Sequence, residues 1–557
     1  MVLFNRKQQQ SVEKTRKKPF FLKHRSSSVY ILAAVSFSFF TNEMLYGIIT
    51  PIMPFVLDSM RRGIDFNSMG TGEQTAYDIA GHEGDISSDT GILLAIYYAG
   101  FGGASPIFGY LSDRVFHNRK STMLLGIIIL IGSLFLFLFV THYWMFALGR
   151  LLQGLGAGGV ATMGYVLVAD TSPADVLGTQ LGRAYMCYMA GLAAGGPAGA
   201  LFLHYGFKVP FIFSLAFVGI ELVLCIFIIE RRNMPKHWFE NLKNDGDGRA
   251  ATTETQYKVN NENDSSGFGG DDRSNGLTMN KSNLQQISDA NNTAEKEYTL
   301  MDVDLQESAT ATPLPLRNSF SSSTPSTLHS QQLQQQNDDI NNKNIITTTQ
   351  LLKSSRIWTI ILVSFCSGWA VITFEPTLPI YLNEEWGYNT SEIGLLLVIQ
   401  LIPTAVASLI SGYMYDRIGA RFLCFITLIL GGISLAVSGI PNRHTAGGAI
   451  PLIATTATNE FFASVYKAAT LPEASLAAKA LANGNDSGNA RAYGLTNMAF
   501  AAGCLTSPLL SGYLYEQTSF FLMCIITSSI LFLAAPFAFI FLGGKIIGFP
   551  CIKKFIS

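Results

Sequence analysis

Four ionisable residues lie inside strongly apolar stretches of the sequence. They are Glu43 in "TNEMLYGIITPIMP", Arg150 in "GRLLQGLGAGG", Glu375 in "FEPTLPI" and Glu460 in "ATNEFFAS". A charge at bilayer depth costs at least about 2.5 to 3.5 kcal/mol on insertion scales, so such residues normally face neighbouring helices or a water-filled cavity. Burial disfavours an ionised carboxylate, which can then exchange a proton for a cation. The pattern predicts a cavity with three carboxylates and one guanidinium; the alternative is that the acids only hydrogen-bond neighbouring helices.

Glu375 is the first choice for the proton-exchanging group because two prolines flank it. Pro376 and Pro379 each remove an amide donor, so the helix is expected to bend or partly unwind around Glu375. Irregular backbone in a membrane is tolerated only where it is buried in protein or lines a wet cavity. Glu43 and Glu460 are the next candidates, and Arg150 is the cation expected to favour ionisation of one carboxylate.

The elements that position these residues are apolar runs long enough to cross a bilayer. The chain has 557 residues, of which 48% are hydrophobic and only 14% are charged, outside the range of ordinary soluble proteins. A span needs roughly 20 apolar residues. Twelve such segments are expected, near 29–57, 90–112, 121–141, 143–169, 181–203, 209–230, 356–382, 391–414, 420–441, 446–470, 491–516 and 519–545.

Charge and composition predict how the rest of the chain is organised. The first 28 residues hold eight Lys and Arg against the single acid Glu13, which favours the cytosol by the positive-inside rule. The stretch 231–355 is rich in Asn, Gln, Ser and Thr and has too few large apolar residues to order itself. The expected plan is therefore a cytosolic tail at 1–28, a six-helix bundle at 29–230, a disordered cytosolic linker at 231–355, a second bundle at 356–545 and a cytosolic tail at 546–557.

The two bundles carry an internal repeat. The stretch "GYLSDR" at 109–114 returns as "GYMYDR" at 412–417, and "RAY" with a following "AAG" occurs at 183–195 and again at 491–503. These pairs fall at corresponding places in the two halves, which indicates a duplicated six-helix unit. The fold class expected is an all-α polytopic membrane protein with twelve transmembrane helices in two pseudo-symmetric bundles.

The same residues resemble the motifs of a known family. "GYLSDRVFHNRK" at 109–120 is similar to the loop motif of the major facilitator superfamily, and "GRLLQGLGAGG" at 149–159 resembles the arginine motif of its fourth helix. Fixed charges in such loops can pair with neighbouring helix ends in one conformation and release them in another. We expect a conformational latch, or alternatively a set of charges that only fixes topology. Its residues would be Asp113, Arg114, Arg119, Lys120, Asp416 and Arg417.

Segment 5 contains a third motif. "AGLAAGGPAGALF" at 190–202 resembles the glycine-proline motif of drug and amine antiporters in the superfamily. Gly195, Gly196 and Gly199 allow close helix contact, and Pro197 should bend the helix. The resemblance implies a close contact between the halves that seals the pathway against leak; the alternative is packing alone.

Segments 1 and 7 are similar to those of vesicular amine transporters. "FEPTLPIYL" resembles their seventh helix, which implies that Glu375 contributes a carboxylate to the substrate pathway. The family's aspartates fall at Asn42 in segment 1, with Glu43 one step later, at Asn459 or Glu460 in segment 10, and at Asn497 in segment 11. One step turns a helix by about 100°, so Glu43 is expected to face elsewhere than Asn42. The expected pathway set also includes Gln153.

The function expected from these features is proton-coupled antiport by alternating access, exporting or sequestering small organic cations or drugs. The alternatives are import of a neutral or anionic nutrient, with Arg150 binding the anion, and a non-transporting sensor whose linker carries the signal. We expect no enzyme chemistry, cofactor, metal or nucleic-acid partner, and a monomer in the lipid bilayer that binds protons and a small-molecule substrate. An acidic organelle such as the vacuole suits a proton antiporter slightly better than the plasma membrane.

Overall fold

The long apolar runs form helices, because only helices satisfy every backbone polar group within one segment in the absence of water. The computed structural model describes residues 20–62, 83–116, 118–203, 205–206, 208–230, 346–388, 390–482 and 488–543, and no strand occurs in these ranges. These residues fall within one compact unit.

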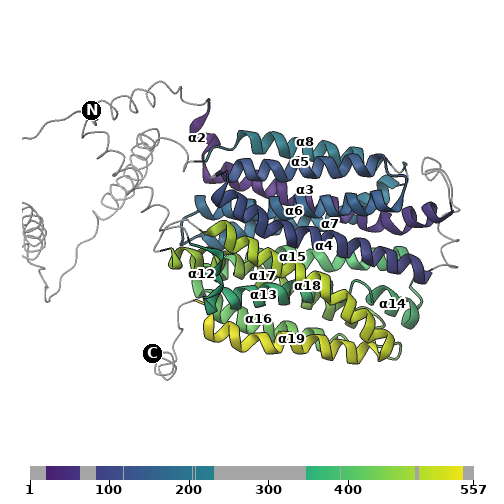
Figure 1. Cartoon of the computed structure of the whole chain (residues 1–557). Helices are drawn as coiled ribbons and strands as arrows, with labels where there is room; N and C mark the ends of the chain where they lie inside the picture. Colours follow the sequence, from purple (N-terminus) through teal and green to yellow (C-terminus); the bar gives the residue numbers. More distant parts are fainter. Residues whose placement is uncertain are drawn as a thin grey trace, which may run out of the picture. The chain divides into compact units, whose positions relative to one another are not determined.

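The first half of the described chain consists of one short helix followed by six long ones (Figure 1). Their bounds are α2 Leu22–Arg25, α3 Ser28–Arg62, α4 Glu83–Arg114, α5 Arg119–Leu138, α6 Tyr143–Thr171, α7 Leu177–Leu203 and α8 Val209–Phe227.

The second half repeats this series, except that the segment corresponding to α3 is divided in two. The bounds are α12 Thr348–Leu352, α13 Ser355–Ile372, α14 Leu378–Trp386, α15 Thr390–Ile418, α16 Ala420–Val437, α17 Ile450–Leu481, α18 Asn489–Gln517 and α19 Phe520–Phe541.

The helices differ in how much of their surface faces other helices. Nine helices in the described ranges are long and apolar enough to cross a membrane. The apolar window of α6 is 83% buried in the protein, whereas that of α8 is only 33% buried. Helices that pack inside a bundle can carry small and polar residues, while those that face lipid must stay apolar.

The packing pattern of the first half recurs in the second. Helix α3 packs on α7, α4 on α6 and α5 on both α6 and α8; correspondingly α13 packs on α18, α15 on α17 and α16 on both α17 and α19. The halves meet mainly through two equivalent pairs, α7 with α15 and α4 with α18 (Figure 1). The duplicated six-helix unit is therefore visible in the contacts as well as in the sequence.

Glycine allows close approach at both of these junctions. A Cβ atom at Gly178 of α7 would lie 2.7 Å from the carbonyl oxygen of Gly412 of α15, and one at Gly494 of α18 would lie 2.7 Å from that of Ser105 of α4. Both distances are too short for a side chain, so the two halves touch here through their backbones.

The glycines of the segment-5 motif lie in a different contact from the one expected. Gly195 and Gly199 face α3, where a Cβ atom at Gly195 would lie 2.6 Å from the carbonyl oxygen of Met44. Gly196 faces α15 more loosely, with Val398 at 4.0 Å from its Cβ position, and Pro197 lies inside the continuous helix α7. The tight glycine contacts of this motif are thus made within the first half, and the expectation of a seal between the halves was wrong for Gly195 and Gly199.

The interruption of segment 7 matches the prediction from its prolines. Helix α13 ends at Ile372 and α14 begins at Leu378, and the intervening residues form turns in which the amide of Glu375 donates to the carbonyl of Ile372 at 3.2 Å. Pro376 disfavours helical backbone in the residue before it, and Pro379 is tolerated in the first turn of α14 because amides there need no helical partner.

Most of the predicted linker, residues 231–345, lies outside the described residues, as do 1–19 of the basic tail and 546–557. The linker ends earlier in the sequence than predicted. Residues 348–352 form α12, which begins with a capping box in which the side chains of Thr347 and Gln350 each bond the other's backbone amide. The folded second half therefore begins before residue 355.

Candidate functional site

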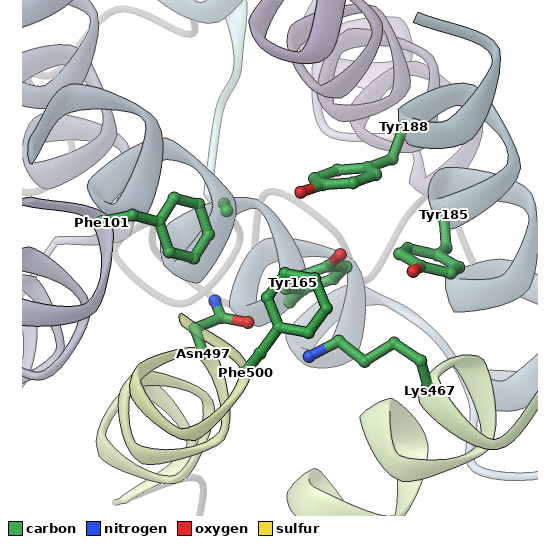
Figure 2. A pocket seen from close by; sticks show the side chains of 8 residues that line it. Phe101, Tyr165, Tyr185, Tyr188, Lys467, Asn497 and Phe500 are labelled. Atoms are coloured by element: carbon green, nitrogen blue, oxygen red, sulfur yellow. The ribbon is translucent and has the colours of Figure 1, made fainter. Parts of the chain in front are cut away.

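A small cavity of about 10 Å³ lies at the junction of both halves. It has room for about one water molecule, so a drug-sized substrate can enter only if the helices around it move apart. Helices α4, α6 and α7 line it from the first half, and α17 and α18 from the second (Figure 2). The lining residues are Phe101, Ala161, Tyr165, Tyr185, Tyr188, Lys467, Asn497 and Phe500.

Lys467 is the charged residue of this lining, and the sequence reasoning did not single it out. Its side chain is 2% exposed, and its amino nitrogen lies 4.2 Å from the centroid of the Phe500 ring. In the part of the chain that the structure describes, this nitrogen has no hydrogen-bond partner. As a charged residue inside predicted segment 10, Lys467 could have been predicted in the same way as Glu460 of that segment.

Glu43 approaches the cavity through a tyrosine. It is 4% exposed, and the Tyr188 hydroxyl, from the cavity lining, donates a hydrogen bond to its carboxylate. Asn42 points to the other side of α3, where its amide donates to the carbonyl of Ser38 at 2.6 Å and to Glu221 at 3.3 Å. The two neighbours therefore face different surroundings, as expected, and the acid is the one on the cavity side.

Glu221 on α8 is an intramembrane acid that was not among the predicted site residues. It is fully buried and bonded by Asn42 on the side of α3 away from Tyr188. Its place in predicted segment 6 was the signal.

Arg150 occupies a layer next to the cavity. It is completely buried, and its guanidinium donates to Gln153 at 3.0 Å and to the sulfur of Met53 at 3.0 Å. The rings of Tyr46 and Tyr97 lie 5.5 and 5.8 Å from its central carbon, within cation–π range. Tyr97 in turn packs against Phe101 of the cavity lining.

Glu375 and Glu460 lie in the same central region. The charge of Arg150 is close enough to act on Glu375, and Glu375 acts in turn on Glu460. Each acid has one buried carboxylate oxygen, Oε2, without a hydrogen-bond partner in the described residues. Two acids that lack full hydrogen bonding are suited to carrying protons, because the neutral form avoids a buried unpaired charge.

The predicted asparagines have separate roles. Asn497 lines the cavity and donates to Thr162 at 3.2 Å, joining α18 to α6 across the two halves. Asn459 is fully buried and donates to the carbonyl of Ala370 at 3.1 Å, which joins α17 to α13. Of the predicted pathway residues, Asn497 is the one that lines this cavity. The expected lining by three carboxylates and one guanidinium is therefore not found there, because Glu43, Glu375, Glu460 and Arg150 lie in the layers around it.

A cluster of paired charges joins the halves at the end of the helices that carries the α4–α5 loop. Asp113 accepts from Arg119 at 2.6 Å and from Arg491 of α18 at 2.9 Å, and its side chain is 5% exposed. Arg119 also pairs with Asp170 at 3.4 Å, and Asp170 accepts from Asn489 of α18 at 3.0 Å. We call these five residues the interbundle ion cluster. Arg491, Asp170 and Asn489 were not predicted, although Arg491 belongs to the repeated "RAY" stretch.

The corresponding acid of the second half, Asp416, binds backbone instead of arginine. It accepts from the amides of Gly178 and Thr179 at 2.7 and 2.8 Å, and from the Thr179 hydroxyl at 2.6 Å. These amides begin α7, where helix N–H groups lack partners and favour a negative charge.

The remaining predicted latch residues do not reach across the halves. Arg114 and Arg417 are exposed, and Arg417 stacks on Tyr413 at 4.3 Å in its own helix. Lys120 stays within the first half, where its amino group donates to the carbonyl of Ile226 at 2.5 Å and its backbone amide donates to Glu230.

Comparison with known proteins agrees with this architecture. The family model of the Major Facilitator Superfamily matches residues 35–381 and 360–546. The chain belongs to the Major Facilitator Superfamily. An uncharacterized MFS-type transporter of Schizosaccharomyces pombe is 24% identical over 507 residues, covering 90% of this chain and 92% of the relative. The MFS-type transporter ppzB of Metarhizium rileyi is 22% identical, covering 95% of this chain and 98% of its own.

A solved structure has the same fold. The human organic anion transporter MFSD10 superposes with a TM-score of 0.58 at 14% identity, over 92% of this chain and 99% of that chain. The superfamily protein described here is thus a multi-pass membrane transporter for small molecules and not an enzyme. The expected all-α fold of two pseudo-symmetric six-helix bundles is confirmed.

Proposed function

We propose that this superfamily member is a proton-coupled antiporter that moves small organic cations, including drugs, out of the cytosol by alternating access. The observation that carries the proposal is the Glu375 carboxylate at the break between α13 and α14. It has a buried oxygen without a hydrogen-bond partner and lies within electrostatic reach of Arg150 and Glu460.

The unpaired carboxylate gives a simple exchange mechanism. An ionised carboxylate buried without a partner is costly, so the site holds either a proton or a cationic substrate. Arrival of the substrate cation replaces the proton, and protonation from the other side releases the substrate. The break in segment 7 lets Glu375 move without unwinding a continuous helix.

The interbundle ion cluster supports the alternating-access part of the proposal. The pair between Asp113 and Arg491 joins the halves at one end, so access from that end requires the pair to separate. Ion pairs that form in one conformation and separate in the other set the balance between the two conformations.

The decisive experiment uses Glu375→Gln in proteoliposomes loaded with a pH-sensitive dye. This variant keeps size and hydrogen bonding but removes the charge change, so we expect substrate-dependent proton flux to be lost while the protein remains folded and inserted. The matched control is Glu384→Gln on α14, an exposed acid bonded by Tyr515. Transport by Glu375→Gln at the original rate and with the original pH dependence would show that Glu375 is structural.

A second candidate function is transport of a neutral or anionic nutrient. Arg150 favours it, because Nε of its buried guanidinium has no hydrogen-bond partner in the described residues and guanidinium groups suit carboxylates. Uptake assays with acidic substrates distinguish the two: accumulation of an acid in the cytosol supports import, and its absence with active cation export supports the first proposal.

We also propose a monomer in the membrane of an acidic organelle, with both chain ends in the cytosol. The eight basic residues among the first 28 support this orientation. Protease treatment of intact organelles should remove tags at either end; protection of both tags would reverse the topology.

A further inference from the structure

The Lys467 amino group is buried, and no acid of the described residues forms an ion pair with it. Its nitrogen has no hydrogen-bond partner within the described chain, and its nearest favourable contact is the face of Phe500 at 4.2 Å. A cation–π contact contributes about 0.5 to 2 kcal/mol, well short of compensating for the desolvation of a lone ammonium. The site is therefore incomplete as it stands, and a negative charge in the cavity would complete it.

Polar groups that suit a carboxylate surround this nitrogen. Figure 2 shows Lys467 extending from α17 towards the middle of the cavity, with the hydroxyls of Tyr165, Tyr185 and Tyr188 on the facing side. The Tyr185 hydroxyl is buried and also lacks a partner in the described residues. An ammonium and the unpaired Tyr185 hydroxyl around one space form a site for a singly charged anion.

The carboxylates of the protein do not occupy this position. Glu43 is bonded to the hydroxyl of Tyr188, and Glu375 interacts with Arg150 in the neighbouring layer. Neither makes an ion pair with Lys467 among the described residues. The cavity therefore has a positive side at Lys467 and negative groups nearby, separated by aromatic rings.

We propose that Lys467, with Tyr165 and Tyr185, forms a subsite for a carboxylate group on the transported molecule. The inference deepens the proposed function and rests on it for the cationic group, which the acids bind. The substrate is then amphoteric, with an amine and a carboxylate on a small aromatic or apolar body. Phe101 and Phe500 supply apolar walls for that body.

The test is a binding cycle with phenylalanine and two probes that each lack one of its charged groups. Phenylalanine carries both charges, 2-phenylethylamine lacks the carboxylate, and 3-phenylpropionate lacks the amine. Binding is measured by isothermal titration calorimetry on the purified full chain in detergent at one pH, without a proton gradient. The proteins are the original chain, Lys467→Gln and the control Lys479→Gln, which removes the same charge from the same helix about 18 Å further along.

The proposal predicts coupling between the probe's carboxylate and Lys467. Loss of the carboxylate weakens binding to the original chain and to Lys479→Gln by about tenfold or more, but changes binding to Lys467→Gln by less than about twofold. An equal loss in all three proteins, or no binding of either carboxylate-bearing probe to the original chain, overturns the proposal.

Two features keep the test decisive. If Lys467→Gln fails to fold, Lys467→Met takes its place, since an apolar side chain of similar length suits the aromatic surroundings. The amine is read separately, from phenylalanine against 3-phenylpropionate. If removal of the amine does not change affinity, the cation part of the proposed function is contradicted and the Lys467 subsite stands. If removal of the amine weakens binding but the carboxylate shows no coupling to Lys467, the subsite is contradicted and the cation part stands.

Discussion

At the α4–α5 end of the helices buried charges are paired across the two halves, whereas in and around the central cavity buried ionisable groups have polar atoms without partners among the described residues. Asp113 is bonded by two arginines, one from each half. Lys467, Glu375 and Glu460 each have a buried polar atom without a partner in the described residues. The difference indicates that the first region is complete in the protein alone, while the second is completed by a proton or a ligand.

The largest effect is expected from breaking the paired region at its centre. Arg119→Met leaves Asp113 and Asp170 short of a buried cation, which should lower the free energy of unfolding by about 3–5 kcal/mol. The readout is the thermal unfolding midpoint in detergent. The control is Arg114→Met, an exposed arginine of the same motif, expected to stay within about 0.5 kcal/mol. Equal midpoints for the two variants would contradict the assigned pairing.

Asp113→Asn should have the next largest effect, on turnover rather than on binding. It weakens the bond between the halves without touching the cavity, so the transport rate should fall roughly tenfold, equivalent to about 1.4 kcal/mol, while substrate affinity changes little. Initial rates and equilibrium binding on the same preparation separate the two quantities. A normal rate with weakened binding would argue against a latch.

The matched variant for this measurement is Asp416→Asn. Asp416 contacts the first amides of α7, where a charge contributes about 0.3–1 kcal/mol. The transport rate of this variant should therefore fall by less than about fivefold. A larger loss than for Asp113→Asn would reverse the ranking of the two junctions.

Removing the unpaired charge of the cavity should leave the empty protein as stable as before or slightly more so. Lys467→Met relieves an uncompensated buried ammonium, so we expect the free energy of unfolding to rise by up to about 1 kcal/mol. Thermal unfolding without ligand measures this, in the same series as Arg119→Met. Destabilisation as large as that of Arg119→Met would show that Lys467 has a counter-charge in the folded protein.

The smallest effect is expected outside both regions. Deletion of residues 240–345 should leave folding and basal transport largely unchanged, since the sequence of this stretch has too few large apolar residues to pack against the bundles. Gel filtration and a transport assay of the shortened chain provide the measurement. Loss of the folded protein from the monomer peak would mean that this stretch contributes to the fold.

The features that could be predicted are those that depend on local sequence. Pro376 and Pro379 fix the break between α13 and α14 whatever packs around them, and long apolar runs locate the helices. The repeated "GYLSDR" and "GYMYDR" stretches indicated both the duplication and the acids at the two junctions. Helix ends were less accurate: α17 continues to Leu481, beyond the predicted end at 470, and most of its residues from Leu471 to Ala478 are buried by other helices.

The features that could not be predicted depend on which neighbour a helix face meets. Nothing in "NEM" shows that Asn42 meets α8 and Glu43 meets Tyr188, since this requires the positions of α7 and α8. The same holds for Gly195, which packs on α3. Lys467 was visible as a charge inside a predicted span, but its lack of a partner emerges only when every surrounding side chain is in place.

The backbone contact between Gly178 and Gly412 has a mechanical consequence. The Asp416 carboxylate also bonds the first amides of α7 here, so α7 and α15 are held close together at this point and can rotate about it as a pivot. From Gly412 to the start of α15 at Thr390 the arm is about 33 Å long, at 1.5 Å per residue. A rotation of about 15°, comparable to subunit rotations in allosteric proteins, moves the Thr390 end of α15 by roughly 9 Å and leaves the contact at Gly412 almost in place.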